Sequence, residues 1–183
     1  MGEQQIRRAF NTIQLDTAYQ AVSMSEELVS NYFKMSANQW LKPRYDVKTL
    51  CDLNTAEIVD GGPFAQIIRY QAQRPGTSLG SESYDFYKIC LQDHTILAAL
   101  NDNSQLCLLP FCLYIIIHEL VHIVRFSRFL QHFEASAEEK LTEERRVHRA
   151  THDILAALKI TGIDSVLDYF HQWRLPLESL NEH

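Results

Sequence analysis

One strongly apolar run constrains this chain more than any other feature. Between Leu113 and Phe126 the run is almost unbroken, and the three isoleucines at 115–117 come directly before the pentad His-Glu-Leu-Val-His at 118–122. The apolar pattern predicts a helix over about 108–133, with Pro110 in its first turn, where proline is tolerated. Two imidazoles and one carboxylate are therefore expected inside an apolar helix.

The spacing of these polar residues favours a metal site. Residues four apart lie on one face of a helix, so His118 and His122 can point at one metal ion. Glu119 lies beside that face, where its carboxylate can reach a water molecule at the metal. Burying these groups among isoleucines without a partner would cost several kcal/mol. A metal ion would satisfy the imidazoles directly. We therefore favour a metal site over a metal-free core helix with polar interruptions.

Composition limits the classes of protein to consider. With 183 residues, 46% of them hydrophobic, the chain is expected to form a single domain over 1–183 with an ample core. The net charge is −6 and no basic stripe stands out, which argues against nucleic-acid binding. The four cysteines show no CxxC spacing, and the N-terminus lacks the apolar core of a signal peptide. A cytoplasmic protein with reduced thiols is the expectation, and a membrane span is not expected because His and Glu at mid-bilayer are costly.

The remaining patterns predict an α+β fold that is mainly helical, with two long metal-bearing helices and a small antiparallel β element. A first helix is expected at 13–34, and 45–62 is expected to be irregular. Aromatic and β-branched residues predict a strand hairpin at about 64–92, joined by a turn rich in Gly and Pro. Ser136 and Glu139 form a capping box for a second long helix at about 137–160, and a last helix is expected at 165–173.

The second long helix supplies candidates for a third ligand, which a catalytic zinc normally needs in addition to a bound water. Glu143 and Glu144 lie 21 and 22 residues after His122 and flank the expected core stripe of their helix on opposite sides. Glu144 is preferred, because His148 follows it by four residues. His148 could then hold the Glu144 carboxylate in position without contacting the metal, or it could project into the site itself.

The pentad and the downstream glutamate, over about 110–159, resemble zincin metallopeptidases of the gluzincin type. The resemblance implies a zincin-like domain in which His118, His122 and Glu144 bind Zn²⁺, and a hydrolase that cleaves peptide bonds with metal-activated water. Glu119 would act as general base and then as general acid. Arg125, His148 and Tyr87 are candidates for the donor to the oxyanion. The implied partner is a peptide or protein substrate, with no nucleic acid and no membrane, and the resemblance gives no oligomeric state.

Three other interpretations remain open at this point. The first is a metal-binding regulatory protein, or a latent and highly selective protease, with the same pentad. The second is a helical bundle that holds iron or a metal pair, in which Glu119 would be a ligand. This is disfavoured because Glu144 and His148 are four apart and do not repeat the Glu-x-x-His spacing of Glu119 and His122. The third is a metal-free interaction domain with an acidic docking face.

Overall fold

The computed structural model describes residues 7–36, 39, 45–73, 83–128 and 134–174. Within these residues the fold is mainly helical, with a small mixed sheet, so the predicted α+β class is confirmed. The order of the longer elements is α1 (Thr12–Tyr32), β1 (Tyr45–Lys48), β2 (Ala65–Gln73), β3 (Ser83–Leu91), α2 (Asp93–Asp102), α3 (Leu108–Ser127), α4 (Ala137–Ala156) and α5 (Ile163–Tyr169). The described residues also form the short 3-10 helices η1 (Leu50–Asp52), η2 (Thr55–Glu57) and η3 (His171–Arg174).

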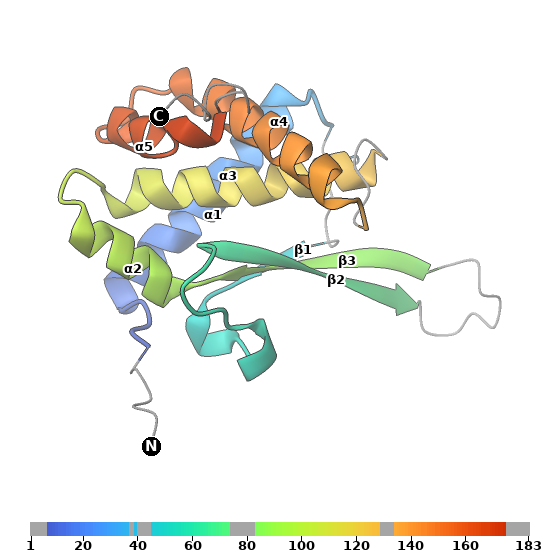
Figure 1. Ribbon diagram of the computed structural model, residues 1–183, viewed down its shortest axis with the longest axis horizontal. Helices are drawn as coiled ribbons and strands as arrows, with labels where there is room; N and C mark the ends of the chain where they lie inside the picture. The colour runs from blue at the N-terminus through green and yellow to red at the C-terminus, as the bar shows by residue number, and fades with distance from the viewer. Residues whose placement is uncertain (1–6, 37–38, 40–44, 74–82, 129–133, 175–183) are drawn as a thin grey trace.

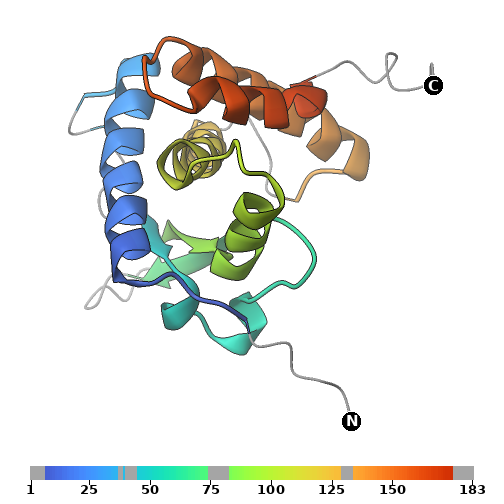
Figure 2. The same cartoon turned by 90° about the vertical axis from the view of Figure 1, so that its left-hand side faces the viewer.

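Helix α3, which carries the pentad, is the centre of the molecule. Seen almost along its axis in Figure 2, it is surrounded by α1 on one side, α4 and α5 on another, and α2 with the sheet below. Thirteen of its residues are buried. A helix that is apolar on nearly all sides needs partners on all sides, and this arrangement provides them. The pentad residues His118, Glu119 and His122 therefore lie on the core helix.

By length and composition alone, α3 could also cross a membrane. However, 72% of its most apolar window is buried inside the protein, as in the core helix of a folded domain. Its described helix ends at Ser127, and residues 129–133 of the predicted 108–133 helix lie outside the described residues. Packing against neighbouring elements accounts for the apolar character of α3.

The sheet corrects one expectation. The predicted hairpin is confirmed: β2 and β3 pair in antiparallel register, with Ile67 opposite Ile89. The stretch 45–62 is not wholly irregular, because β1 pairs with β3 in parallel, so the order is β1-β3-β2 and the sheet is mixed, not purely antiparallel. A strand of four residues is too short for a periodic pattern, and its pairing depends on a partner about 40 residues away. Figure 1 shows the sheet below α3.

Local signals determine the ends of the two helices next to α3. Asn11 and Gln14 form a capping box at the start of α1, and Ser136 and Glu139 form the predicted one at the start of α4. Helix α4 ends at Ala156, a few residues before the predicted end near 160. It contacts α3 and buries Val147, among other residues, and Figure 1 shows it above α3 on the side away from the sheet. This packing brings the first two turns of α4 to the pentad.

Candidate metal centre

The two histidines of the pentad converge, as the four-residue spacing predicts. Their Nε2 atoms lie 3.2 Å apart. The side chain of His118 is 12% exposed and that of His122 is 6% exposed, so both rings are largely removed from water. The neighbouring Leu120 and Val121 are fully buried and fix this part of α3 in the core. The pair thus presents two ring nitrogens at one point on the surface of α3.

Glu144 reaches the same point from α4. Its Oε2 lies 3.2 Å from Nε2 of His118, and its Oε1 lies 3.1 Å from Nε2 of His122. Burial alone would raise the pKa of Glu144, but hydrogen bonds from both imidazoles outweigh this effect and hold the pKa well below its ordinary value. Glu144 is therefore an anion placed against two imidazoles.

Glu143, the other candidate for the third ligand, has a different partner. It accepts hydrogen bonds from Nε and Nη2 of Arg125 and a longer one of 3.4 Å from Arg146. Glu143 is 6% exposed. Adjacent residues on a helix point about 100° apart, so only one of the two glutamates can face the imidazoles. The structure places Glu144 there and joins Glu143 to α3 by an ion pair.

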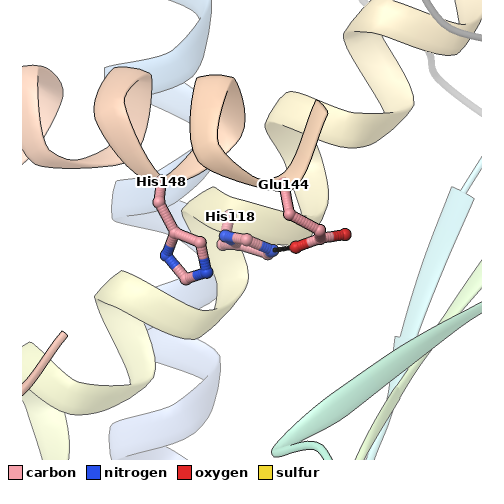
Figure 3. Close-up of side chains that lie close together, drawn as sticks. All are labelled: His118, Glu144 and His148. Carbon is pink, nitrogen blue, oxygen red and sulfur yellow. Dashed lines mark ion pairs between the residues drawn. The ribbon is translucent and has the colours of Figure 1, made fainter. Parts of the chain in front are cut away.

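His148 also enters the site, on the side chosen from the sequence. Figure 3 shows its ring beside that of His118, with one nitrogen directed toward His118 and Glu144. The ring centroids of His118 and His148 are 4.3 Å apart. His118, Glu144 and His148 form a group that could hold a metal ion, with one ligand atom from each lying within 4.8 Å of the others. Burial lowers the pKa of His148 to about 3, so its imidazole is neutral at ordinary pH.

Tyr114 is a site residue that the sequence analysis missed. Its hydroxyl lies 2.8 Å from Nδ1 of His148, and both residues are buried. Burial raises the pKa of Tyr114, and the nearby charge of Arg174 offsets this rise only in part, so the phenol keeps its proton. A signal existed in the sequence, because Tyr114 precedes His118 by four residues and so shares its face of the helix.

Glu119 lines a pocket beside the imidazoles. The pocket has a volume of about 550 Å³ and is also lined by Ile115, His118, Glu144 and His148. Burial raises the pKa of Glu119, an effect that His118 and His122 partly offset. A carboxylate with a raised pKa next to converging ligand atoms is suited to accept and return a proton. The expected position of Glu119 beside the metal-binding face matches this geometry.

The other two candidates for an oxyanion donor lie elsewhere. Arg125 is engaged by Glu143. Tyr87 is 4% exposed and stacks on Phe126, with ring centroids 5.9 Å apart, and it does not line the pocket. Of the three side chains considered from the sequence, His148 is the one that lines the pocket.

The donor set suits a small divalent metal ion. Tetrahedral zinc with bonds of about 2.0 Å separates its ligand atoms by about 3.3 Å. The two imidazole Nε2 atoms lie 3.2 Å apart, and each lies 3.1–3.2 Å from a different oxygen of Glu144, close to that separation. Two imidazole nitrogens and one carboxylate oxygen are also a ligand set found in catalytic zinc sites. The group that includes His148 is looser, because its atoms spread over up to 4.8 Å.

Comparisons with protein-family models, with curated proteins and with solved structures give no significant match. The function is therefore inferred from the geometry of this site.

Proposed function

We propose that this protein is a zinc-dependent hydrolase that cleaves peptide bonds. The observation that carries the proposal is the convergence of His118, His122 and Glu144 beside a pocket that Glu119 lines. The two imidazole Nε2 atoms lie 3.2 Å apart, with one oxygen of Glu144 within 3.1–3.2 Å of each. This ligand set is also the one that the resemblance to gluzincins implies. We propose that these three side chains hold the zinc and that the zincin-like description extends to the arrangement of α3 and α4.

The chemistry follows from the residues around that site. Zinc bound here would lower the pKa of a water molecule and polarise a carbonyl group. The Glu119 carboxylate accepts a proton from the water, whose oxygen forms a bond to the carbonyl carbon. The protonated carboxyl then gives the proton to the amide nitrogen as the carbon–nitrogen bond breaks. The products are one carboxylic acid and one amine, and Glu119 returns to its starting state.

His148 is the proposed donor to the carbonyl oxygen as negative charge develops there. A Tyr114 hydroxyl that donates to Nδ1 of His148 leaves the ring proton on Nε2, the nitrogen that faces the site. A buried donor held in place before the reaction stabilises such charge better than one that must reorient. Tyr114 thus acts as a positioning residue for His148.

A peptide is the proposed substrate because of the sheet next to the pocket. Strand β2 is an edge of the described sheet, and Ala65, its first residue, lines the pocket. An open strand edge can pair with an extended peptide through backbone hydrogen bonds. The β2 edge could therefore hold a peptide backbone across the entrance of the site.

The test combines metal analysis with peptide hydrolysis. We expect the purified protein to contain one zinc per chain and to cleave members of a mixed peptide library. Glu119→Gln should keep one zinc per chain and lose turnover by at least about 10²-fold, because it removes proton transfer but no ligand. Hydrolysis that is unchanged in Glu119→Gln would contradict the assignment of Glu119.

One observation supports a second candidate, a metal-binding protein without peptidase activity. His148 belongs to the group of side chains that could hold an ion. A fourth protein ligand would leave no position for water and would make the site structural. X-ray absorption spectroscopy of the zinc protein distinguishes the two, with three protein ligands plus an additional oxygen expected for a hydrolase. Two iron atoms per chain would instead indicate the metal-pair bundle.

A further inference from the structure

Much of the pocket beside the candidate metal centre is aromatic, and these rings come largely from the C-terminal part of the described chain. Tyr169 ends α5, Phe170 follows it, and Trp173 lies in η3. Phe170 is 5% exposed and stacks on Tyr114 with ring centroids 3.9 Å apart and planes 3° apart. These packed rings give the pocket a rigid apolar surface next to His148.

Trp173 completes this surface in an unusual way for a large hydrophobic residue. It is 53% exposed, although it lines the pocket and stacks on His148 with ring centroids 5.8 Å apart. Pro63 and Phe64, just before β2, and Ala65, its first residue, add further apolar lining. An indole that lines a pocket and still has half its surface in water can gain free energy by covering that surface with a ligand.

The acidic and histidine side chains that line the pocket all belong to the candidate metal centre. Within the described residues they are Glu119, Glu144, His118 and His148, and no lysine or arginine lines the pocket. A charged side chain placed against the aromatic wall would lose its hydration without gaining a polar partner from the rings. The pocket volume of about 550 Å³ is within the usual range of roughly 300–1,000 Å³ for small-ligand pockets.

We propose that this pocket is the specificity pocket of the site and receives a large apolar side chain, aromatic above all, from the bound peptide. Trp173 forms the adjustable part of the pocket, and Phe170 with Tyr114 forms the fixed part. Charged side chains bind more weakly. This inference rests on the proposed peptidase function for its substrate class, but the pocket itself can be tested through binding alone.

The test uses the full-length Glu119→Gln protein as purified, so that peptides bind without being cleaved. End-capped pentapeptides Gly-Gly-X-Gly-Gly, with X as Phe, Leu, Glu or Lys, are titrated by isothermal calorimetry. The Phe peptide should bind most tightly, the Leu peptide next, and the Glu peptide at least tenfold more weakly than the Phe peptide. Equal affinities within twofold, tightest binding of the Glu or Lys peptide, or no binding by any peptide would each overturn the proposal.

A matched pair of variants tests the role of Trp173 in the same background. Trp173→Ala should weaken binding of the Phe peptide about tenfold, since it removes an aromatic contact. Tyr19→Ala removes an aromatic side chain of similar exposure, 51%, from α1, which does not line the pocket, and should leave the affinity unchanged. Equal effects of the two variants would overturn the assignment of Trp173.

Cleavage by the wild-type protein then separates this inference from the proposed function. If the Phe peptide binds preferentially and none of the four peptides nor the library is cleaved, the pocket assignment stands and the hydrolase proposal falls. If peptides are cleaved without regard to X, the hydrolase proposal stands and the specificity pocket falls.

Discussion

Glu143 accepts two hydrogen bonds from the guanidinium of Arg125, and this ion pair joins α4 to the pentad helix three residues beyond His122. Both side chains are largely buried, with Glu143 at 7% and Arg125 at 18% exposure. Because Glu143 points toward Arg125, its neighbour Glu144 turns toward the imidazoles. The ion pair therefore selects which of two adjacent carboxylates faces the candidate metal site.

The first prediction separates the two glutamates. Glu143→Gln should keep zinc close to one per chain and lower the free energy of unfolding by about 1–3 kcal/mol, because Arg125 loses its charged partner. Glu144→Gln should lose zinc, since it removes the only anionic ligand. Metal content by mass spectrometry and urea unfolding measure the two effects. Loss of zinc from the Glu143 variant with retention in the Glu144 variant would reverse the assignment.

The second prediction concerns metal removal. We assume that zinc binds only the folded protein and saturates the site under assay conditions. Removing zinc with a chelator should then lower the melting temperature by about 5–10 °C. His118→Ala, which cannot form the site, should show no further decrease with the chelator. Differential scanning calorimetry measures both proteins. A wild-type melting temperature that does not respond to the chelator would favour a metal-free interaction domain.

The third prediction tests the hydroxyl of Tyr114. Tyr114→Phe removes the group that lies 2.8 Å from Nδ1 of His148 and leaves the ring packing on Phe170 in place. We expect kcat to fall about 10- to 100-fold with KM within twofold, because His148 loses its fixed orientation and tautomer. Zinc affinity should be unchanged.

The same variant discriminates between the two candidate functions. If His148 were a metal ligand, the Tyr114 hydroxyl would hold that ligand in position. Tyr114→Phe would then lower zinc affinity about 10- to 100-fold. Competition with a zinc-binding dye measures this affinity directly. The two readouts, kcat and zinc affinity, therefore assign His148 as a donor to the substrate or as a fourth ligand.

The fourth prediction concerns pH and an ion pair away from the site. Glu57 is 3% exposed and accepts hydrogen bonds from Nζ of Lys88 at 2.7 and 2.8 Å. The hydrogen bond from Lys88, followed by that from the backbone of Asn54, lowers the pKa of Glu57 below its ordinary value of 4.5. The stabilisation is therefore fully present above pH 4.5 and is lost as the pH falls below it.

Glu57→Gln should flatten the pH dependence of unfolding between about pH 5 and 3 and should cost about 3 kcal/mol at pH 7. Urea unfolding across that pH range is the measurement. In the double variant Glu57→Gln/Lys88→Met, no unpaired ammonium remains, so it should be less destabilised than the single variant at pH 7. If the stability of Glu57→Gln followed the wild-type pH curve, Glu57 would not be the group responsible for the pH dependence.

Elements that depend on nearby residues could be predicted from the amino-acid sequence alone. The apolar run at 113–126 predicted α3, the Ser136–Glu139 capping box marked the start of α4, and the turn-linked strands gave the β2–β3 hairpin. The four-residue spacing also placed the imidazoles of His118 and His122 on one face. Helical periodicity, capping and turns depend on residues a few positions apart, so one sequence is enough to predict them.

Features that depend on contacts between distant segments could be seen only in the folded chain. The pairing of β1 with β3 joins residues about 40 positions apart, and the separation of Glu143 from Glu144 depends on Arg125 in another helix. The pocket unites α3 and α4 with the start of β2 and with Trp173 near the end of the described chain. No pattern among nearby residues in the sequence predicts such contacts. Their free energy is gained only when the packed helices bring these side chains together.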